Sequence, residues 1–177
     1  LQALIARQRD ADFAIAQALK AAKPDIINVF GGPQVLDRPE EIRQYLGKHR
    51  YVDLACHGEG ERVFLEVLEN ARTRRWQVVP SVSFLDRASG AFIQQPRIER
   101  ISDVNEIPSP YLDGILDPLI KAYPEERWIS LWETNRGCPF SCSFCGWGGA
   151  VNSKVNRWDL ERLYGEAAIG MPLGAFR

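Results

Sequence analysis

The sequence lacks an excess of charge of either sign. Its 177 residues include 22 lysines and arginines against 23 aspartates and glutamates, which gives a formal net charge of −1. Domains that bind nucleic acid through its phosphates usually carry a basic surface, and this balance gives no indication of one. We therefore expect no nucleic-acid partner.

The sequence also lacks a long apolar run. About 20 consecutive apolar residues are needed to cross a bilayer, and no segment approaches that length. The first 23 residues are amphipathic, unlike the apolar core of a signal peptide. We therefore expect a globular protein with no membrane partner.

Cysteine is scarce and unevenly placed. Three of the four cysteines lie at 138, 142 and 145, in a loop with glycines on both sides. A disulfide framework needs an even number of cysteines in a small secreted chain. A structural zinc site needs a fourth ligand, which only the distant Cys56, His49 or His57 could supply. The triplet therefore favours an iron–sulfur cluster with one iron free of protein sulfur, with zinc as the alternative. Such a cluster is sensitive to oxygen, so we expect a cytoplasmic protein.

The spacing Cys-x-x-x-Cys-x-Phe-Cys resembles the motif of the radical S-adenosylmethionine (SAM) superfamily. The resemblance implies that Cys138, Cys142 and Cys145 hold a [4Fe–4S] cluster whose open iron chelates SAM. One electron would then cleave SAM to methionine and a 5′-deoxyadenosyl radical. Phe144 would shield the cluster, and the Gly146 backbone would approach SAM. Plain loop packing is the alternative for Phe144.

The first 75 residues alternate between predicted helices and strands. We expect helices over 9–22 and 37–49 and a third after residue 61, separated by strands over 25–30 and 51–56. This alternation is typical of a doubly wound parallel α/β sheet.

Both predicted strands end in glycine, in Gly31-Gly32-Pro33 and Gly58-Glu59-Gly60-Glu61. Ligands of such sheets bind at the carboxyl ends of the strands, where glycine lets a large ligand approach the backbone. A tight turn is the alternative for the first segment. Together the two segments resemble the cobalamin-binding domain of cobalamin-dependent radical SAM enzymes. The resemblance implies cobalamin contacts from Gly31, Gly32, Pro33, Gly58, Glu59 and Gly60.

The rest of the chain differs in character. A β-hairpin over 78–98 and a proline-containing segment over 101–111 are predicted first. Residues 128–134 are the predicted first strand of a partial βα (TIM-like) radical SAM barrel. We expect three regions: 1–75, a cobalamin-binding Rossmann-like domain; 76–124, hairpin and linker; and 125–177, the start of the barrel.

By this resemblance the protein is an enzyme, a methyltransferase acting on an unactivated carbon or phosphorus. Radical ring closure or rearrangement, or a non-catalytic binding module, are the alternatives. We expect a small-molecule or peptide substrate and an electron donor such as flavodoxin or ferredoxin. The chain begins at Leu1, and only one barrel strand and one barrel helix are predicted. We therefore expect a piece of a longer protein that is inactive alone.

Overall fold

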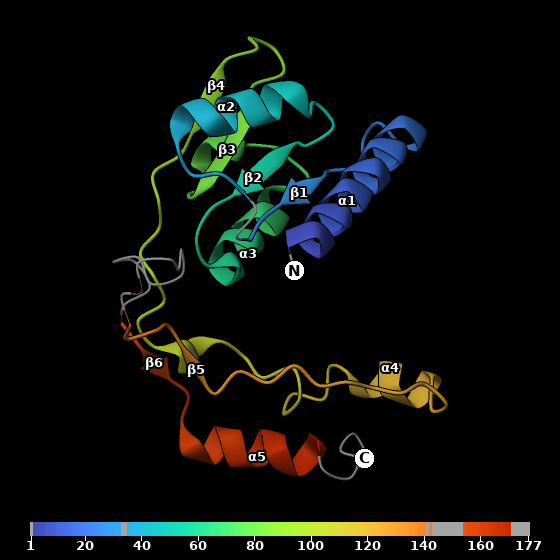
Figure 1. The fold of residues 1–177 in the computed structure, drawn as a ribbon, viewed down its shortest axis with the longest axis vertical. Coiled ribbons are helices and arrows are strands. Elements are labelled where there is room, and N and C mark those ends of the chain that lie inside the picture. The colour runs from blue at the N-terminus through green and yellow to red at the C-terminus, as the bar shows by residue number, and fades with distance from the viewer. Residues whose placement is uncertain (1, 33–34, 141, 143–153, 171–177) are drawn as a thin grey trace. The chain divides into compact units, whose positions relative to one another are not determined.

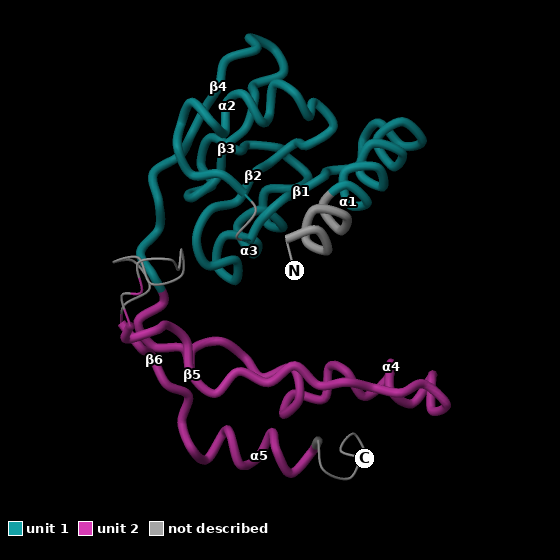
Figure 2. Tube along the Cα trace, in the orientation of Figure 1, with its two compact units in different colours: residues 1–100 teal, residues 101–177 magenta. Residues whose placement is uncertain are grey.

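The computed structural model describes residues 2–32, 35–140, 142 and 154–170. The chain divides into two compact units, residues 1–100 and 101–177 (Figure 2). No helix in the described part of the chain is long and apolar enough to cross a membrane. Four residues of the predicted sites lie outside the described residues: Pro33, Phe144, Cys145 and Gly146.

The first unit is built on a four-stranded mixed sheet. Its strands, in the order β1-β2-β3-β4, are β1 (Val29–Phe30), β2 (Leu54–Cys56), β3 (Val82–Leu85) and β4 (Phe92–Gln94). The pair β1–β2 is parallel, whereas β3 runs antiparallel to both β2 and β4. The expected all-parallel sheet is therefore only partly right. The predicted hairpin forms, but it extends the sheet of the first unit instead of standing apart from it.

Helices cover both faces of this sheet (Figure 1). They are α1 (Gln2–Ala22), α2 (Pro39–Lys48) and α3 (Gly60–Asn70), and a 3₁₀ turn, η1 (Trp76–Val78), precedes β3. Successive strand residues point to opposite faces, so Leu54 packs with the side chains of α3 while Ala55 packs with those of α2. The buried helix residues are Ile42 and Leu46 on α2 and Val63 and Val67 on α3. The fold is thus a three-layer α/β arrangement, as the alternation of elements predicted.

Aromatic rings attach α1 to the rest of the unit. Phe13 stacks on the His49 ring with centroids 4.3 Å apart and on Phe30 at 5.6 Å. The Nδ1 atom of His49 lies 2.8 Å from the Tyr51 hydroxyl oxygen. His49 therefore has a packing role at the end of α2.

The second unit contains a small antiparallel ladder and short helices. Its elements are η2 (Val104–Glu106), α4 (Asp117–Ala122), β5 (Asn135–Arg136), β6 (Asn156–Arg157) and α5 (Leu160–Gly170). Residues 128–134, predicted as a barrel strand, form no strand in the structure. Ile129 and Leu131 there are 86% and 91% exposed, so no sheet covers them. The ladder of this unit instead joins β5 to β6.

Candidate functional site

The carboxyl ends of β1 and β2 place two glycine segments side by side. β1 ends at Phe30 and β2 at Cys56, and because the strands are parallel both chains leave the sheet at the same edge. A Cβ atom added at Gly31 would lie 3.7 Å from the Cβ of Cys56, so the start of the first segment lies beside the end of β2. The structure thus brings together the two segments that the sequence singled out.

The backbone at this edge is open. A Cβ atom added at Gly32, Gly58 or Gly60 would meet no atom of the described residues within 4 Å, and all three residues are exposed. Gly32 (φ +83°) and Gly58 (φ +78°) adopt a backbone conformation that other L-residues rarely adopt. A large flat ligand can therefore lie directly on main chain here, and the residues present fit a corrin ring.

Glu59 has a different role from its neighbours. Its carboxylate Oε1 pairs with Nε of Arg100 at 3.1 Å, and both side chains are mostly buried. Glu59 is the residue before α3, yet its side chain makes no capping hydrogen bond. The ion pair fixes the position of the segment between the two glycines.

A buried histidine supports the same edge from below. His57 is 3% exposed; its Nε2 lies 2.8 Å from the Ser83 hydroxyl and its Nδ1 3.2 Å from a carboxylate oxygen of Asp37. That carboxylate also pairs with Arg97 at 2.5 Å. Burial lowers the pKa of His57 below its ordinary 6.5, against the opposing effect of the Asp37 hydrogen bond. The neutral ring then donates a hydrogen bond from Nδ1 to Asp37 and accepts one at Nε2 from the Ser83 hydroxyl.

The sequence indicated only part of this network. His57 stands directly after the predicted strand over 51–56, but its partners could not be read from its position. Asp37, Ser83 and Arg97 were missed because they are far apart along the chain. The one available sign was Ser83, a hydroxyl within the apolar strand β3 that is fully buried in the structure.

Cys56 is not suited to bind a metal. Burial raises the pKa of its thiol to about 11. The thiolate is the form that binds metals, and at neutral pH this side chain stays protonated. Cys56 therefore packs against the core beside Gly31.

The cysteine-bearing segment is closed at its base by the ladder β5–β6. Asn135 pairs with Arg157 and Arg136 with Asn156, so the chain on either side of residues 137–155 is held together. Cys138 and Cys142 are free thiols, the first half-buried and the second exposed. The described residues contain no cluster of three possible metal ligands, and Cys145 lies outside them. The three-cysteine ligand set therefore stays a prediction.

Side chains of α5 and its neighbours brace this base. The Arg162 guanidinium lies 4.1 Å from the centroid of the buried Trp158 ring. Arg162 also pairs with Glu166 at 2.9 Å, and Glu166 accepts a 2.9 Å hydrogen bond from the Trp132 indole. Desolvation raises the pKa of Glu166, but hydrogen bonds from Ser109, Arg162 and Trp132 outweigh it, and the net effect lowers the pKa.

Known proteins match both units. A cobalamin-dependent radical SAM methyltransferase, TokK of Streptomyces tokunonensis, is 40% identical over 156 residues, which are 86% of this chain and 22% of that protein. The 2-(S-pantetheinyl)-carbapenam-3-carboxylate methyltransferase of Streptantibioticus cattleyicolor matches with the same identity and coverage. The chain is similar to cobalamin-dependent radical SAM methyltransferases.

The same likeness appears in three dimensions. The cobalamin-dependent SAM radical enzyme OxsB, solved with aqua-cobalamin and SAM bound, superposes with a TM-score of 0.67 over 94% of this chain and 22% of that one. Its sequence identity is 20%, so the comparison concerns the fold alone. No protein-family profile matches the chain. The chain spans about a fifth of the length of the curated relatives.

Proposed function

We propose that this chain supplies the cobalamin-binding and cluster-binding parts of a cobalamin-dependent radical SAM methyltransferase. The observation that carries the proposal is the open glycine edge, where Gly32 and Gly58 expose main chain at the ends of two parallel strands. The similarity to TokK supports it independently. We further propose that residues 125–177 begin a partial βα barrel and that the protein works in the cytoplasm.

The chain's own residues hold and shape the two cofactor sites. When bound, a [4Fe–4S] cluster provides the electron that cleaves SAM reductively, and cobalamin carries the methyl group to be transferred. The glycine backbone would receive the corrin ring, while Cys138, Cys142 and Cys145 would provide the thiolates. Phe144 and Gly146 would lie against the cluster and SAM. We propose a small-molecule or peptide substrate that receives the methyl group on carbon or phosphorus, and flavodoxin or ferredoxin as electron donor.

Radical ring closure is the alternative to methyl transfer, with the same [4Fe–4S] cluster, SAM and cobalamin. An anaerobic magnesium-protoporphyrin IX monomethyl ester cyclase of Rubrivivax gelatinosus is 28% identical over 73% of this chain. Radical ring closure is therefore the alternative activity. The higher identity to the two methyltransferases favours methyl transfer.

Titration with hydroxocobalamin tests the cobalamin site directly. Gly32→Val and Gly58→Val should abolish the spectral change that binding produces, because a branched side chain would stand where the corrin ring lies. Gly90→Val is the matched control: Gly90 has φ +71° and no atom of the described residues within 4 Å of an added Cβ, but it lies in the β3–β4 turn. The backbone strain is similar in all three variants, so equal affinity of all three for hydroxocobalamin would contradict the proposal.

A further inference from the structure

A cleft opens at the edge of the first unit's sheet that lies opposite the glycine segments. β2 begins at Leu54 and the antiparallel β3 ends at Leu85, so both ends lie away from Gly58. The cleft has a volume of about 760 Å³ and lies beside Asp53 and the turn that carries Arg87. Pockets of this size hold small organic ligands. No predicted site residue lines it.

The lining carries more positive than negative charge. Four arginines face two aspartates, and both aspartates are already engaged. The Asp53 carboxylate, 6% exposed, pairs with Lys20 at 2.7 Å and with Arg87. Asp86 accepts hydrogen bonds of 2.7 and 2.8 Å from the backbone and hydroxyl of Ser89, within its own turn. The two carboxylates therefore do not neutralise the positive charge of Arg43, Arg50 and Arg74.

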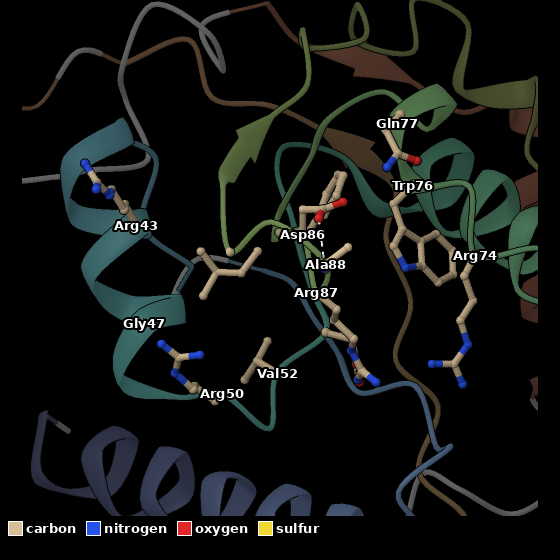
Figure 3. A pocket seen from close by; sticks show the side chains of 14 residues that line it. Arg43, Gly47, Arg50, Val52, Arg74, Trp76, Gln77, Asp86, Arg87 and Ala88 are labelled. Carbon is tan, nitrogen blue, oxygen red and sulfur yellow. Dashed lines mark hydrogen bonds and ion pairs between the residues drawn. The ribbon is translucent and has the colours of Figure 1, made fainter.

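Arginine side chains remain available to a ligand. In the described part of the chain, neither Arg43 nor Arg50 has a hydrogen-bond or ion-pair partner. Figure 3 shows Arg87 between Arg50 on one side and Arg74 and Trp76 on the other. A guanidinium binds phosphate through a planar pair of N–H donors, which an ammonium group cannot offer.

The other part of the lining is apolar. Trp76, Phe84 and Val52 are all buried residues that contribute to the cleft wall. An anion alone would not use this surface, whereas a phosphate joined to a ring would. We propose that this cleft binds a phosphate-bearing small molecule of the nucleotide class, with its phosphates at the arginines and its ring on the Trp76 side.

Calorimetric titration of the full chain tests this site. Adenosine diphosphate and inorganic pyrophosphate are the probes, and uncharged adenosine is the control ligand. We expect both anions to bind, adenosine diphosphate more tightly, and adenosine to bind much more weakly. Arg50→Gln should weaken adenosine diphosphate binding about tenfold, because a hydrogen bond to a charged group is lost. Arg50 is exposed and pairs with no described residue, so this variant should fold normally.

The matched variant is Arg72→Gln, an exposed arginine outside the cleft. It should bind adenosine diphosphate as wild type does, and saturating hydroxocobalamin should leave that affinity unchanged. An equal loss in both variants would mean general attraction to a basic surface and would overturn the proposal. Displacement by hydroxocobalamin, or no heat from either anion at millimolar concentration, would overturn it as well.

Discussion

The His57 side chain connects three parts of the first unit, which are the segment after β1, the end of β2 and strand β3. Its ring connects the segment after β1, where Asp37 lies, with Ser83 on β3, while its own backbone continues β2. A buried imidazole with both nitrogens engaged is fixed in tautomer and orientation. The glycine edge therefore rests on an imidazole whose pKa is lowered from its ordinary 6.5 by burial.

The stability of the first unit should depend on His57 protonation. The folded-state pKa lies below the ordinary 6.5, so the unfolded chain takes up a proton first as the pH falls. The contribution is complete above about pH 6.5 and is lost on acidification towards the folded pKa. The facing charged groups are Asp37 and Arg97. Urea unfolding at several pH values should show a steeper decline for wild type than for His57→Gln; parallel curves would contradict this.

At the scale of elements, leucines on α2 and α3 differ in how deeply they are buried, and therefore in how much they stabilise the fold. Leu46 on α2 is 1% exposed, whereas Leu65 on α3 is 56% exposed. Leu46→Ala should lower the free energy of unfolding by about 2–5 kcal/mol, because it leaves a cavity in the core. Leu65→Ala should change it by less than about 0.5 kcal/mol. Chemical denaturation of both variants measures the difference, and similar losses would refute the packing described.

The segment that carries Cys138, Cys142 and Cys145 is predicted to bind an iron–sulfur cluster. After anaerobic reconstitution with iron and sulfide, the chain should show the absorbance of one oxygen-labile [4Fe–4S] cluster. Cys138→Ala, Cys142→Ala and Cys145→Ala should each remove it, since each loses one of three thiolate ligands. Cys56→Ala should retain it because that thiol is buried and protonated. Stoichiometric zinc without iron–sulfur absorbance would support the zinc alternative instead.

Sequence patterns predicted the helices better than their detailed contacts. Asp37 and Glu40 have the spacing of a capping box, but the residue before α2 is Arg38, and Asp37 bonds to His57 instead. On α3, Val63 and Val67 are buried, whereas the neighbouring apolar residue Phe64 is half exposed. A narrow helix face buries only residues four apart, and the sequence does not tell how wide the facing surface is.

The glycine edge could be predicted because its chemistry is local. Gly31, Gly32 and Gly58 each lie within two residues of the end of a strand, so a sequence pattern suffices to find them. The predicted strand 128–134 failed for the opposite reason. Its alternating apolar residues, such as Ile129 and Leu131, favour a strand only where a sheet covers them, and they are exposed here.

At the scale of the whole molecule, the hairpin decides where the first unit ends. β3 pairs with β2 and also carries Val82 and Phe84 into the core beside α3. The unit therefore extends to Arg100, which additionally holds Glu59. The predicted first region, 1–75, would end before two of the four strands.

Truncation distinguishes these two boundaries. Residues 1–100 alone should unfold cooperatively on heating and bind hydroxocobalamin, because the sheet and both cores are complete. Residues 1–75 should fail to unfold cooperatively, since Leu54 and Val67 would lose their partners on β3. Thermal melts followed by circular dichroism compare them. Cooperative melting of the shorter piece would show that the hairpin is dispensable.

The ladder between β5 and β6 has a kinetic consequence. Because Arg136 and Asn156 are already paired, the entropy needed to bring the two ends of residues 137–155 together is spent during folding. Once one thiolate has bound iron, the other two thiolates meet that iron at the high effective concentration of a closed loop. The delivery of iron and sulfide would then limit the rate of cluster assembly. The time that the cysteines need to come together would contribute little to that rate.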